Sequence, residues 1–451
     1  MKVTPDFPAE VQQAAEKAAA DPRLPDLDRT DLAFVTIDPA DSMDLDQAVY
    51  LERNSDGYRV FYAIADVAAF VSPGDLVDIE ANRRGETLYG ADSKIPLHPK
   101  VLSEGAASLL PDQIRPALLW TIDLDSTGEG THVTVERARV RSRAKLSYEG
   151  VQHDIDAGTA DPMFAILQEI GEKRLAKEAA RGGVSLPLPE QEIDIADDHW
   201  RLEFRKLMPV ENWNAQISLL TGMGAASLMV AGKVGLLRTL PEPDPRDLER
   251  LRRTAHALRI EWPEDQPYPD FIRSLDPARP NHAAMVVAST RLLRGASYVG
   301  FNGELPAQPE QAALASTYAH VTAPLRRLGD RYAGEICLSL CAGVDVPQWV
   351  LDKLGELPTT LRESGHRANQ YQNAIVNLVE AAVLAPRIGD AFEGVVVEYD
   401  EKADTKGVIT LREPAIEAPV VGSAPLPLGQ DVKVTLTKAD VATRTVEFSL
   451  T

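Results

Sequence analysis

Four aspartates lie within nine positions of one short stretch, TIDPADSMDLDQ, which follows the apolar run LAFV. They are Asp38, Asp41, Asp44 and Asp46. Carboxylates this close together cannot all be ionised without a cation, because like charges raise one another's pKa. Mg²⁺ prefers carboxylate oxygens and keeps water positions open for a phosphate. The stretch therefore predicts either a divalent-metal site or a solvated, capped turn.

A second candidate for chemistry is the stretch YAHVTAPLRRLGDR, residues 318–331. Arg326, Arg327 and Arg331 stand at the start of a predicted helix, just after Pro324. Arginines in such a place can clamp a phosphate or stabilise the charge that develops on it. The alternative is an ordinary helix start whose arginines form ion pairs.

A row of cations occupies alternate positions of the predicted strand THVTVERARVRSRAKL. The row consists of Arg137, Arg139, Arg141, Arg143 and Lys145. A strand sends alternate side chains to one face, so all five would line one side of a sheet. Such a row is typical either of a track for a phosphate backbone or of an edge strand protected by charge.

Composition sets the wider bounds. The 451 residues suffice for two or three domains, and 44% of them are hydrophobic, which is enough for real cores. The net charge of −21 argues against a surface that coats nucleic acid in general. A polyanionic partner would therefore need a local basic patch or metal ions.

Cysteine content and the N-terminus indicate a cytoplasmic protein. Cys337 and Cys341 are the only cysteines in the sequence, so there is no disulfide framework. Their spacing favours two packed helix residues over a zinc site, because no matching ligand pair accompanies them. The N-terminal stretch lacks the apolar core of a signal peptide.

One segment approaches the length of a membrane span, ISLLTGMGAASLMVAGKVGLL at residues 217–237. It contains Lys233 and runs into the proline-rich LPEPDP. A buried core helix with small residues for close packing is the better interpretation, so we expect no membrane association.

The pattern of the chain changes three times. A short helix is predicted over residues 8–20, and strands dominate to about residue 145, with a hairpin that turns at NSDG and a second at STGEG. Helical signals prevail from about 160 to 380. The last 65 residues alternate as expected of a small antiparallel barrel. The prediction is an α+β protein, with a β-rich N-terminal half, a helical C-terminal half and a terminal all-β barrel.

These motifs together resemble the ribonuclease II / ribonuclease R family of exoribonucleases, which is defined by the RNB catalytic domain. TIDPADSMDLDQA resembles the family's aspartate box, and YAIADVAAFVSPGDLVDIEANRRGETLY continues the likeness. RARVRSRAKLSYEGV and TAPLRRLGD follow in the family's order. The resemblance implies a helical leader over 1–30, an RNB domain over 31–385 and an OB-fold of the ribosomal S-one type over 386–451.

The resemblance implies a processive, hydrolytic 3′→5′ exoribonuclease that takes part in RNA decay and turnover. It would act as a monomer on single-stranded RNA with a free 3′ end, not on DNA, and release nucleoside 5′-monophosphates. Asp38, Asp44 and Asp46 would form the catalytic cluster and, with Gln47, hold one or two Mg²⁺ ions. Arg326 would hold the scissile phosphate.

The same resemblance assigns RNA contacts. Tyr89 would stack on the 3′-terminal base, and Tyr148 and Glu211 would grip the terminal ribose. Arg327 and the arginine row from Arg137 to Arg143 would contact RNA as well. No aromatic near GGVSLPLPEQ offers a second half of the stacking clamp.

The sequence also departs from the family pattern. Gln47 stands where the family has a fourth aspartate, and Ala63 stands where it has a histidine. The leader is too short for two N-terminal cold-shock domains. Two alternatives therefore stay open. One is a catalytically inactive RNA-binding relative, for which Gln47 is the argument. The other is a regulatory or adaptor protein that uses the acidic terminal barrel for protein contacts.

Overall fold

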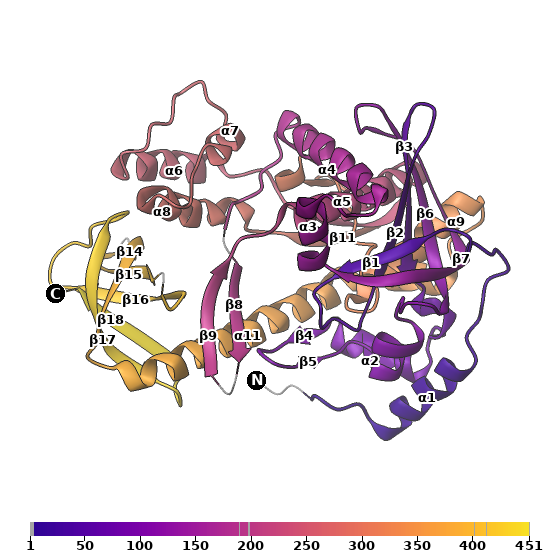
Figure 1. Cartoon of the computed structure of the whole chain (residues 1–451), viewed down its shortest axis with the longest axis horizontal. Helices are drawn as coiled ribbons and strands as arrows, with labels where there is room; N and C mark the ends of the chain where they lie inside the picture. Colours follow the sequence, from indigo (N-terminus) through magenta and orange to yellow (C-terminus); the bar gives the residue numbers. More distant parts are fainter. Residues whose placement is uncertain (1–3, 189, 197–198, 401, 412, 451) are drawn as a thin grey trace.

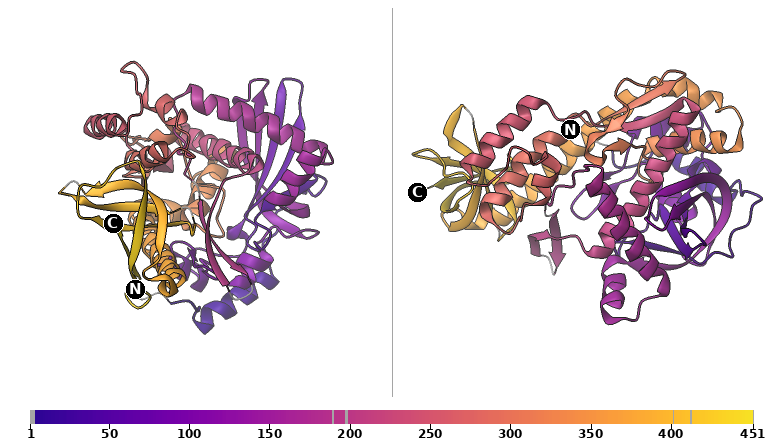
Figure 2. Two further views of the ribbon diagram at one scale, coloured as in Figure 1. Left: turned by 60° about the vertical axis from the view of Figure 1, so that its left-hand side comes forward. Right: turned by 90° about the horizontal axis from the view of Figure 1, so that it is seen from above.

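The computed structural model describes residues 4–188, 190–196, 199–400, 402–411 and 413–450. Two closed β-barrels lie at opposite ends of the molecule, with helices between and around them (Figure 1). A view from above shows the same separation (Figure 2). The arrangement confirms the predicted α+β class and the terminal barrel.

The first barrel is closed by five strands in the order β1-β2-β3-β6-β7. They are β1 (Phe34–Asp38), β2 (Gln47–Arg53), β3 (Gly57–Ala65), β6 (Ile114–Asp125) and β7 (Gly130–Ser147). The β2–β3 and β6–β7 pairs are the two hairpins that the sequence predicts. Closure comes from β1 pairing in parallel with β7, which places Asp38 opposite Ser147.

Helices flank this barrel and lead to the second one. Those before the midpoint of the chain are α1 (Ala9–Ala20), α2 (Leu76–Arg84), α3 (Tyr148–Ala157), α4 (Pro162–Ala180) and α5 (Pro209–Gly232). The later ones are α6 (Pro245–Ala257), α7 (Tyr268–Arg273), α8 (Pro280–Ser289), α9 (Leu328–Ala342), α10 (Gln348–Leu354) and α11 (Leu357–Leu384). Helix α1 confirms the short N-terminal helix.

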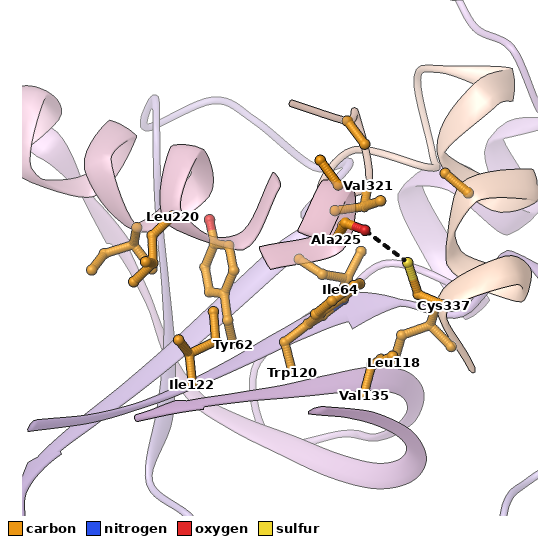
Figure 3. Packing of buried hydrophobic residues seen from close by; sticks show 14 of the residues in the cluster. Tyr62, Ile64, Leu118, Trp120, Ile122, Val135, Leu220, Ala225, Val321 and Cys337 are labelled. Carbon is orange, nitrogen blue, oxygen red and sulfur yellow. Dashed lines mark hydrogen bonds between the residues drawn. The ribbon is translucent and has the colours of Figure 1, made fainter. Parts of the chain in front are cut away.

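Both faces of β3 are buried, which fixes the barrel against its helices. Tyr62 and Ile64 belong to a core that includes residues of α5 and α9, whereas Phe61 and Ala63 belong to a core that includes α1. Figure 3 shows Tyr62, Ile64 and Trp120 with Leu220, Ala225 and Cys337 beside them. The Cys337 thiol donates to the carbonyl of Ala225 at 3.7 Å, so this cysteine is a packed helix residue as expected.

The segment from 160 to 380 is less uniformly helical than the sequence predicts. It also contains strand pairs: β8 (Glu190–Ala196) with β9 (His199–Arg205), β10 (Val234–Thr239) with β11 (Ser297–Asn302), and β12 (Glu310–Gln311) with β13 (Ser316–Thr317). A further short pair, β4 (Leu88–Tyr89) with β5 (Lys94–Ile95), lies in the first third of the chain. The long-range pair β10–β11 has no local signal in the sequence, because its strands are far apart in the chain.

Helix α5 ends before the apolar stretch 217–237 does. Lys233 adopts a left-handed conformation with φ 56°, and the chain then continues as β10. Among the described residues, α5 is the one helix long and apolar enough to cross a membrane. It packs against α4, α9 and the first barrel, and a Cβ on Gly222 would lie 2.2 Å from the Tyr318 ring. Close packing through small residues is therefore its observed role, as expected for a core helix.

The second barrel is closed in the order β14-β15-β16-β18-β17. Its strands are β14 (Ala391–Asp400), β15 (Ala403–Leu411), β16 (Ile416–Gly422), β17 (Asp431–Asp440) and β18 (Thr445–Leu450). The long helix α11 runs to it from the side of the first barrel (Figure 1). Val379 and Leu384 of α11 join the core of the second barrel, so this helix ties the two parts together.

Glu380 of α11 makes this junction sensitive to pH. Its side chain is buried and accepts from the Gln191 amide at 3.0 Å, and burial raises its pKa from 4.5 to about 7. A carboxyl whose pKa is higher in the folded state destabilises the fold as pH rises from about 4.5 to about 7. We expect Glu380→Gln to raise the stability at pH 8 by on the order of 2 kcal/mol, with almost no change at pH 4.5.

Calorimetric melting at the two pH values checks this expectation. The glutamine keeps one oxygen that can accept from Gln191 and removes the carboxyl that titrates. Glu393→Gln is the matched control, because Glu393 is exposed on β14. Equal changes in melting temperature at pH 4.5 and pH 8 would contradict the account.

Candidate active site

The aspartate-rich loop connects β1 to β2 at one end of the first barrel. Asp38 is the last residue of β1, and Asp46 directly precedes β2. The hairpin-like return of the chain therefore brings both ends of the loop to the same edge. Asp41, at the tip, is exposed and remains outside the site.

Asp46 is the most deeply buried of the four aspartates in this loop, with 4% of the residue exposed. It accepts from the backbone N–H of Leu325 at 2.8 Å and lies 3.3 Å from the Arg326 guanidinium. Burial nevertheless raises its pKa to about 7, against the opposing effect of Arg326. Asp46 thus joins the aspartate loop to the segment 319–327, here called the arginine loop, which is almost 280 residues away in the chain.

Asp38 lies in the same electrostatic environment. Burial raises its pKa to about 6; the Arg326 charge opposes the rise and the Asp44 charge adds to it. Its Oδ2 atom is buried and has no hydrogen-bond partner among the described residues. The negative charge on Asp38 is therefore poorly compensated by the protein itself.

Asp44 is paired with a cation that the sequence did not single out. The ammonium of Lys94, on β5, donates to Asp44 at 2.6 Å and lies 3.1 Å from Glu104. Lys94 lies in the stretch DSKIPLHP, and a lone lysine beside a short turn carries no distinctive pattern. Its role becomes visible only when β4 and β5 bring it against the aspartate loop.

Gln47, predicted to be a metal ligand, has two protein partners in this structure. Its amide nitrogen donates to the carbonyl of Thr322 at 2.7 Å, and its amide oxygen accepts from the Tyr62 hydroxyl at 2.5 Å. A carboxylate could not donate to the Thr322 carbonyl. Gln47 therefore cross-links the barrel to the arginine loop, and its oxygen is already engaged.

The three arginines at the start of α9, two in the arginine loop and Arg331 in the helix, have separate partners. Arg326, paired with Asp46, keeps 45% of its side chain exposed and can reach a ligand. Arg327 pairs with the buried Asp330 at 2.8 Å, and Arg331, 3% exposed, pairs with Asp78 at 2.6 Å. Arg327 and Arg331 thus fit the alternative of structural ion pairs, and an RNA contact of Arg327 stays a prediction.

The aromatic candidates lie around the same cluster. Tyr89, at the end of β4, is 44% exposed. The charges of Arg326, Asp44 and Asp46 are close enough to influence the pKa of its hydroxyl. Tyr148, the first residue of α3, accepts from the Asn214 amide at 3.2 Å and feels the charges of Asp38 and Glu211. Burial raises the pKa of both hydroxyls, so both stay protonated and can donate.

Glu211 is already engaged in protein contacts. Its carboxylate accepts from the Arg205 guanidinium at 2.7 and 3.0 Å and from the Met208 N–H at 2.6 Å, at the start of α5. Binding a ribose would require it to share or give up these donors. Tyr148 and Asn214, which hydrogen-bond to each other, are the neighbouring polar groups.

The arginine row on β7 does not form a free cationic track. Arg137 pairs with Asp66 at 2.8 Å and with Glu335, and Arg139 pairs with Asp28 at 3.2 Å. Arg143 and Lys145 donate to the carbonyls of Asp31 and Ala40. Arg141 and Arg143 are exposed, and Arg141 lies near Asp28. The row thus anchors neighbouring segments of the protein, and its contact with RNA stays a prediction.

The donor set fits a divalent cation, although no preformed site is present. Among the described residues no three His, Cys, Asp or Glu side chains are grouped closely enough to hold a metal ion. However, the Oδ2 of Asp38 is buried without a partner among the described residues, and burial raises the pKa of Asp38 and Asp46, so a nearby cation would stabilise their ionised forms. Hard oxygen ligands of this kind suit Mg²⁺. Asp38, Asp44 and Asp46 are the residues that would hold it.

Lys94 should compete with a metal ion for Asp44. Replacing it by methionine leaves Asp44 without its ammonium partner, so we expect Lys94→Met to increase Mg²⁺ affinity by about tenfold, or about 1.4 kcal/mol. Isothermal titration calorimetry with Mg²⁺ alone checks this. Lys100→Met is the matched control, because Lys100 is 66% exposed and lies 3.9 Å from Glu104. Unchanged or weaker affinity in Lys94→Met would contradict the competition.

Two family models match this chain. The model of the RNB domain matches residues 27–338, and that of the RNase II-type exonuclease C-terminal S1 domain matches residues 390–451. Both agree with the resemblance found in the sequence motifs. The second model falls on the second β-barrel.

Individual proteins and structures are similar as well. Ribonuclease R of Escherichia coli is 26% identical over 399 residues, which are 82% of this chain and 48% of that protein. The chain thus spans about half the length of that relative. The structure of Mycoplasma genitalium RNase R in complex with ribose-methylated single-stranded RNA has a TM-score of 0.87 at 19% identity, over 99% of this chain and 76% of that one. Yeast Ssd1, described as a pseudonuclease, has a TM-score of 0.69 at 16% identity, over 92% of this chain and 51% of that one.

Proposed function

Because the chain belongs to the RNB domain family, we propose that it is a metal-dependent 3′→5′ exoribonuclease that hydrolyses single-stranded RNA. The observation that carries this proposal is the convergence of Asp38, Asp44 and Asp46 with Arg326 at one end of the first barrel. Carboxylates for a cation beside an exposed guanidinium for a phosphate are the groups that phosphodiester hydrolysis needs.

Each residue of the cluster has a part in this proposal. The Arg326 guanidinium, anchored by Asp46 and partly exposed, would hold the scissile phosphate and stabilise the charge that develops on it. A divalent cation in such a site supplies positive charge and activates water at neutral pH. We propose Mg²⁺ in this role, at one or two positions per site. Asp46 would fix Arg326 in place through the same contact that ties the two loops together.

Recognition of the RNA end would fall to the surrounding side chains. The exposed ring of Tyr89 offers a stacking surface for the terminal base, which every base can use. The Tyr148 hydroxyl and the Asn214 amide offer polar contacts to the terminal ribose, where a 2′-hydroxyl separates RNA from DNA. We therefore propose RNA as substrate and not DNA.

The remaining parts of the proposal concern product and setting. The enzyme would release nucleoside 5′-monophosphates processively, act as a monomer in the cytoplasm and serve RNA decay and turnover. The second barrel, with its match to an S1 domain, would add an RNA-binding surface.

An RNA labelled on its 3′-terminal nucleotide tests the direction and product of hydrolysis. The proposal predicts that labelled nucleoside 5′-monophosphate is the first product, seen by thin-layer chromatography before the chain has shortened appreciably. A labelled oligonucleotide as first product would indicate internal cleavage and contradict it. The same RNA with a terminal 2′-deoxyribose should react more slowly if the ribose contacts matter.

The second candidate function is an RNA-binding protein without catalysis. Two observations favour it: Gln47 is committed to Tyr62 and Thr322, and Lys94 neutralises Asp44. A relative in fold, yeast Ssd1, is described as a pseudonuclease. Retention of intact RNA in the presence of Mg²⁺ would support this candidate over the first.

A further inference from the structure

A cavity of about 800 Å³ is lined by none of the aspartates of the β1–β2 loop. The β6–β7 hairpin, α4, α5 and β13 form its walls. Its volume falls in the range of sites for small molecules. The first turns of α5 contact residues near the aspartates: Asn214 contacts Tyr148, and Ser218 contacts Thr322. The residues of α5 that line the cavity come later in the helix, between Leu220 and Leu228. Asn214 and Met223 are separated by about 14 Å along the helix axis.

Three cations line this cavity: Arg174, Lys177 and Arg181, all from α4 or its C-terminal end. The Arg174 side chain is 3% exposed; it donates to the Gly128 carbonyl at 3.2 Å, but its Nε has no partner among the described residues. Arg181 donates through Nε to the Leu314 carbonyl at 2.7 Å, and its buried Nη2 is likewise without a partner among them. Each of these two guanidinium groups therefore has a buried N–H that no described residue satisfies.

One carboxylate, Glu129, also lines the cavity and offsets only part of the charge of the three cations. Glu129, with 57% of its side chain exposed, lies 3.1 Å from Lys177 and 3.7 Å from Arg174. Glu178 is buried but accepts from Ser185 and Gln216. Burial lowers the pKa of Arg174 and Arg181, because removing a charged guanidinium from water costs free energy. A bound anion would offset that cost.

We propose that this cavity is a binding site for a mononucleotide, held by its phosphate on Arg174, Lys177 and Arg181. Guanidinium and ammonium groups that line one cavity match the charge of a phosphate, and a guanidinium also matches the geometry of its oxygens. The apolar side chains of Ile122, Val133, Leu220 and Met223 line the same space and offer a surface for the base. The hydroxyls of Ser316 and Thr317 add polar contacts. The site is separate from the proposed catalytic cluster and does not depend on it.

The Met223 methyl group provides a local probe of this site, because its sulfur lies 3.3 Å from Arg174. The full chain, labelled with ¹³C in its methionine methyl groups, is titrated with AMP, inorganic phosphate and adenosine in EDTA. The Met223 signal is identified by its loss in Met223→Leu. We expect AMP to shift it in a saturable way, phosphate to act at least tenfold more weakly, and adenosine to have no effect at equal concentration.

Variants assign the binding to the cations. Lys177→Ala should weaken AMP binding at least tenfold, and since 28% of the Lys177 side chain is exposed, this variant leaves the core intact. Lys173→Ala, on the same helix but outside the cavity, should bind AMP as the unaltered protein does. No Met223 shift at millimolar AMP, an equal response to adenosine, or unchanged binding in Lys177→Ala would overturn the proposal. Equal affinities for phosphate and AMP would overturn its nucleotide part. Since neither metal nor RNA is present, these outcomes are independent of nuclease activity.

Discussion

Asp46→Asn should lower the rate of RNA cleavage by on the order of 10³-fold while leaving RNA affinity within about twofold. The asparagine oxygen can still accept from the Leu325 N–H, so the loop keeps its position. What is lost is the charge that holds Arg326 at 3.3 Å and that would help to hold a cation. Single-turnover cleavage of labelled RNA and fluorescence anisotropy measure the two quantities.

Asp41→Asn is the matched control for this variant. Asp41 lies in the same loop but is exposed, so its replacement should change neither rate nor affinity appreciably. A parallel loss of binding and cleavage in Asp46→Asn would mean that the cluster serves structure instead of chemistry.

Arg326→Ala should also reduce cleavage strongly, by about 10²- to 10³-fold, because it removes the exposed guanidinium that faces the proposed phosphate position. Its melting temperature should remain close to that of the unaltered protein, since 45% of the side chain is exposed. Steady-state kinetics and thermal melting together test this pair of outcomes.

Arg331→Ala provides the contrast, because Arg331 is buried against Asp78 and donates to the Val71 carbonyl. Removing one partner of a buried ion pair costs about 3–5 kcal/mol of folding free energy. This variant should therefore have a clearly lower melting temperature, whereas the cleavage rate of its folded fraction should change little. If Arg326→Ala were as unstable as Arg331→Ala, or retained full activity, the assignment of Arg326 to the phosphate would be wrong.

The strands of both barrels were predictable because their signals are local. Alternating apolar residues and turn sequences such as NSDG mark each hairpin within a few residues. The pair β10–β11 was missed because its strands pair across more than fifty intervening residues. The end of α5 was missed too, since a continuous apolar run conceals the change from helix to strand at Lys233.

The residues of the candidate active site also fall into those that the sequence predicted and those that it did not. Spacing marked the aspartate cluster and the three arginines as candidates, and the family resemblance singled out Arg326; the structure brings Asp38 and Asp46 to that arginine. The partners of these groups were not predictable, because a lysine such as Lys94 or a tyrosine such as Tyr62 becomes informative only through its contact. The alternation of the arginine row on β7 was predicted correctly, but its protein partners, such as Asp28, were not predictable because they lie elsewhere in the chain.

The most direct test of the account is incubation of 5′-labelled single-stranded RNA and matched DNA with the purified protein, in Mg²⁺ and in EDTA, resolved on a sequencing gel. The account predicts a ladder that collapses to a short end product, on RNA only and in Mg²⁺ only. Intact RNA under all conditions, from a protein that still binds it, would contradict the account and assign the chain to RNA binding without catalysis.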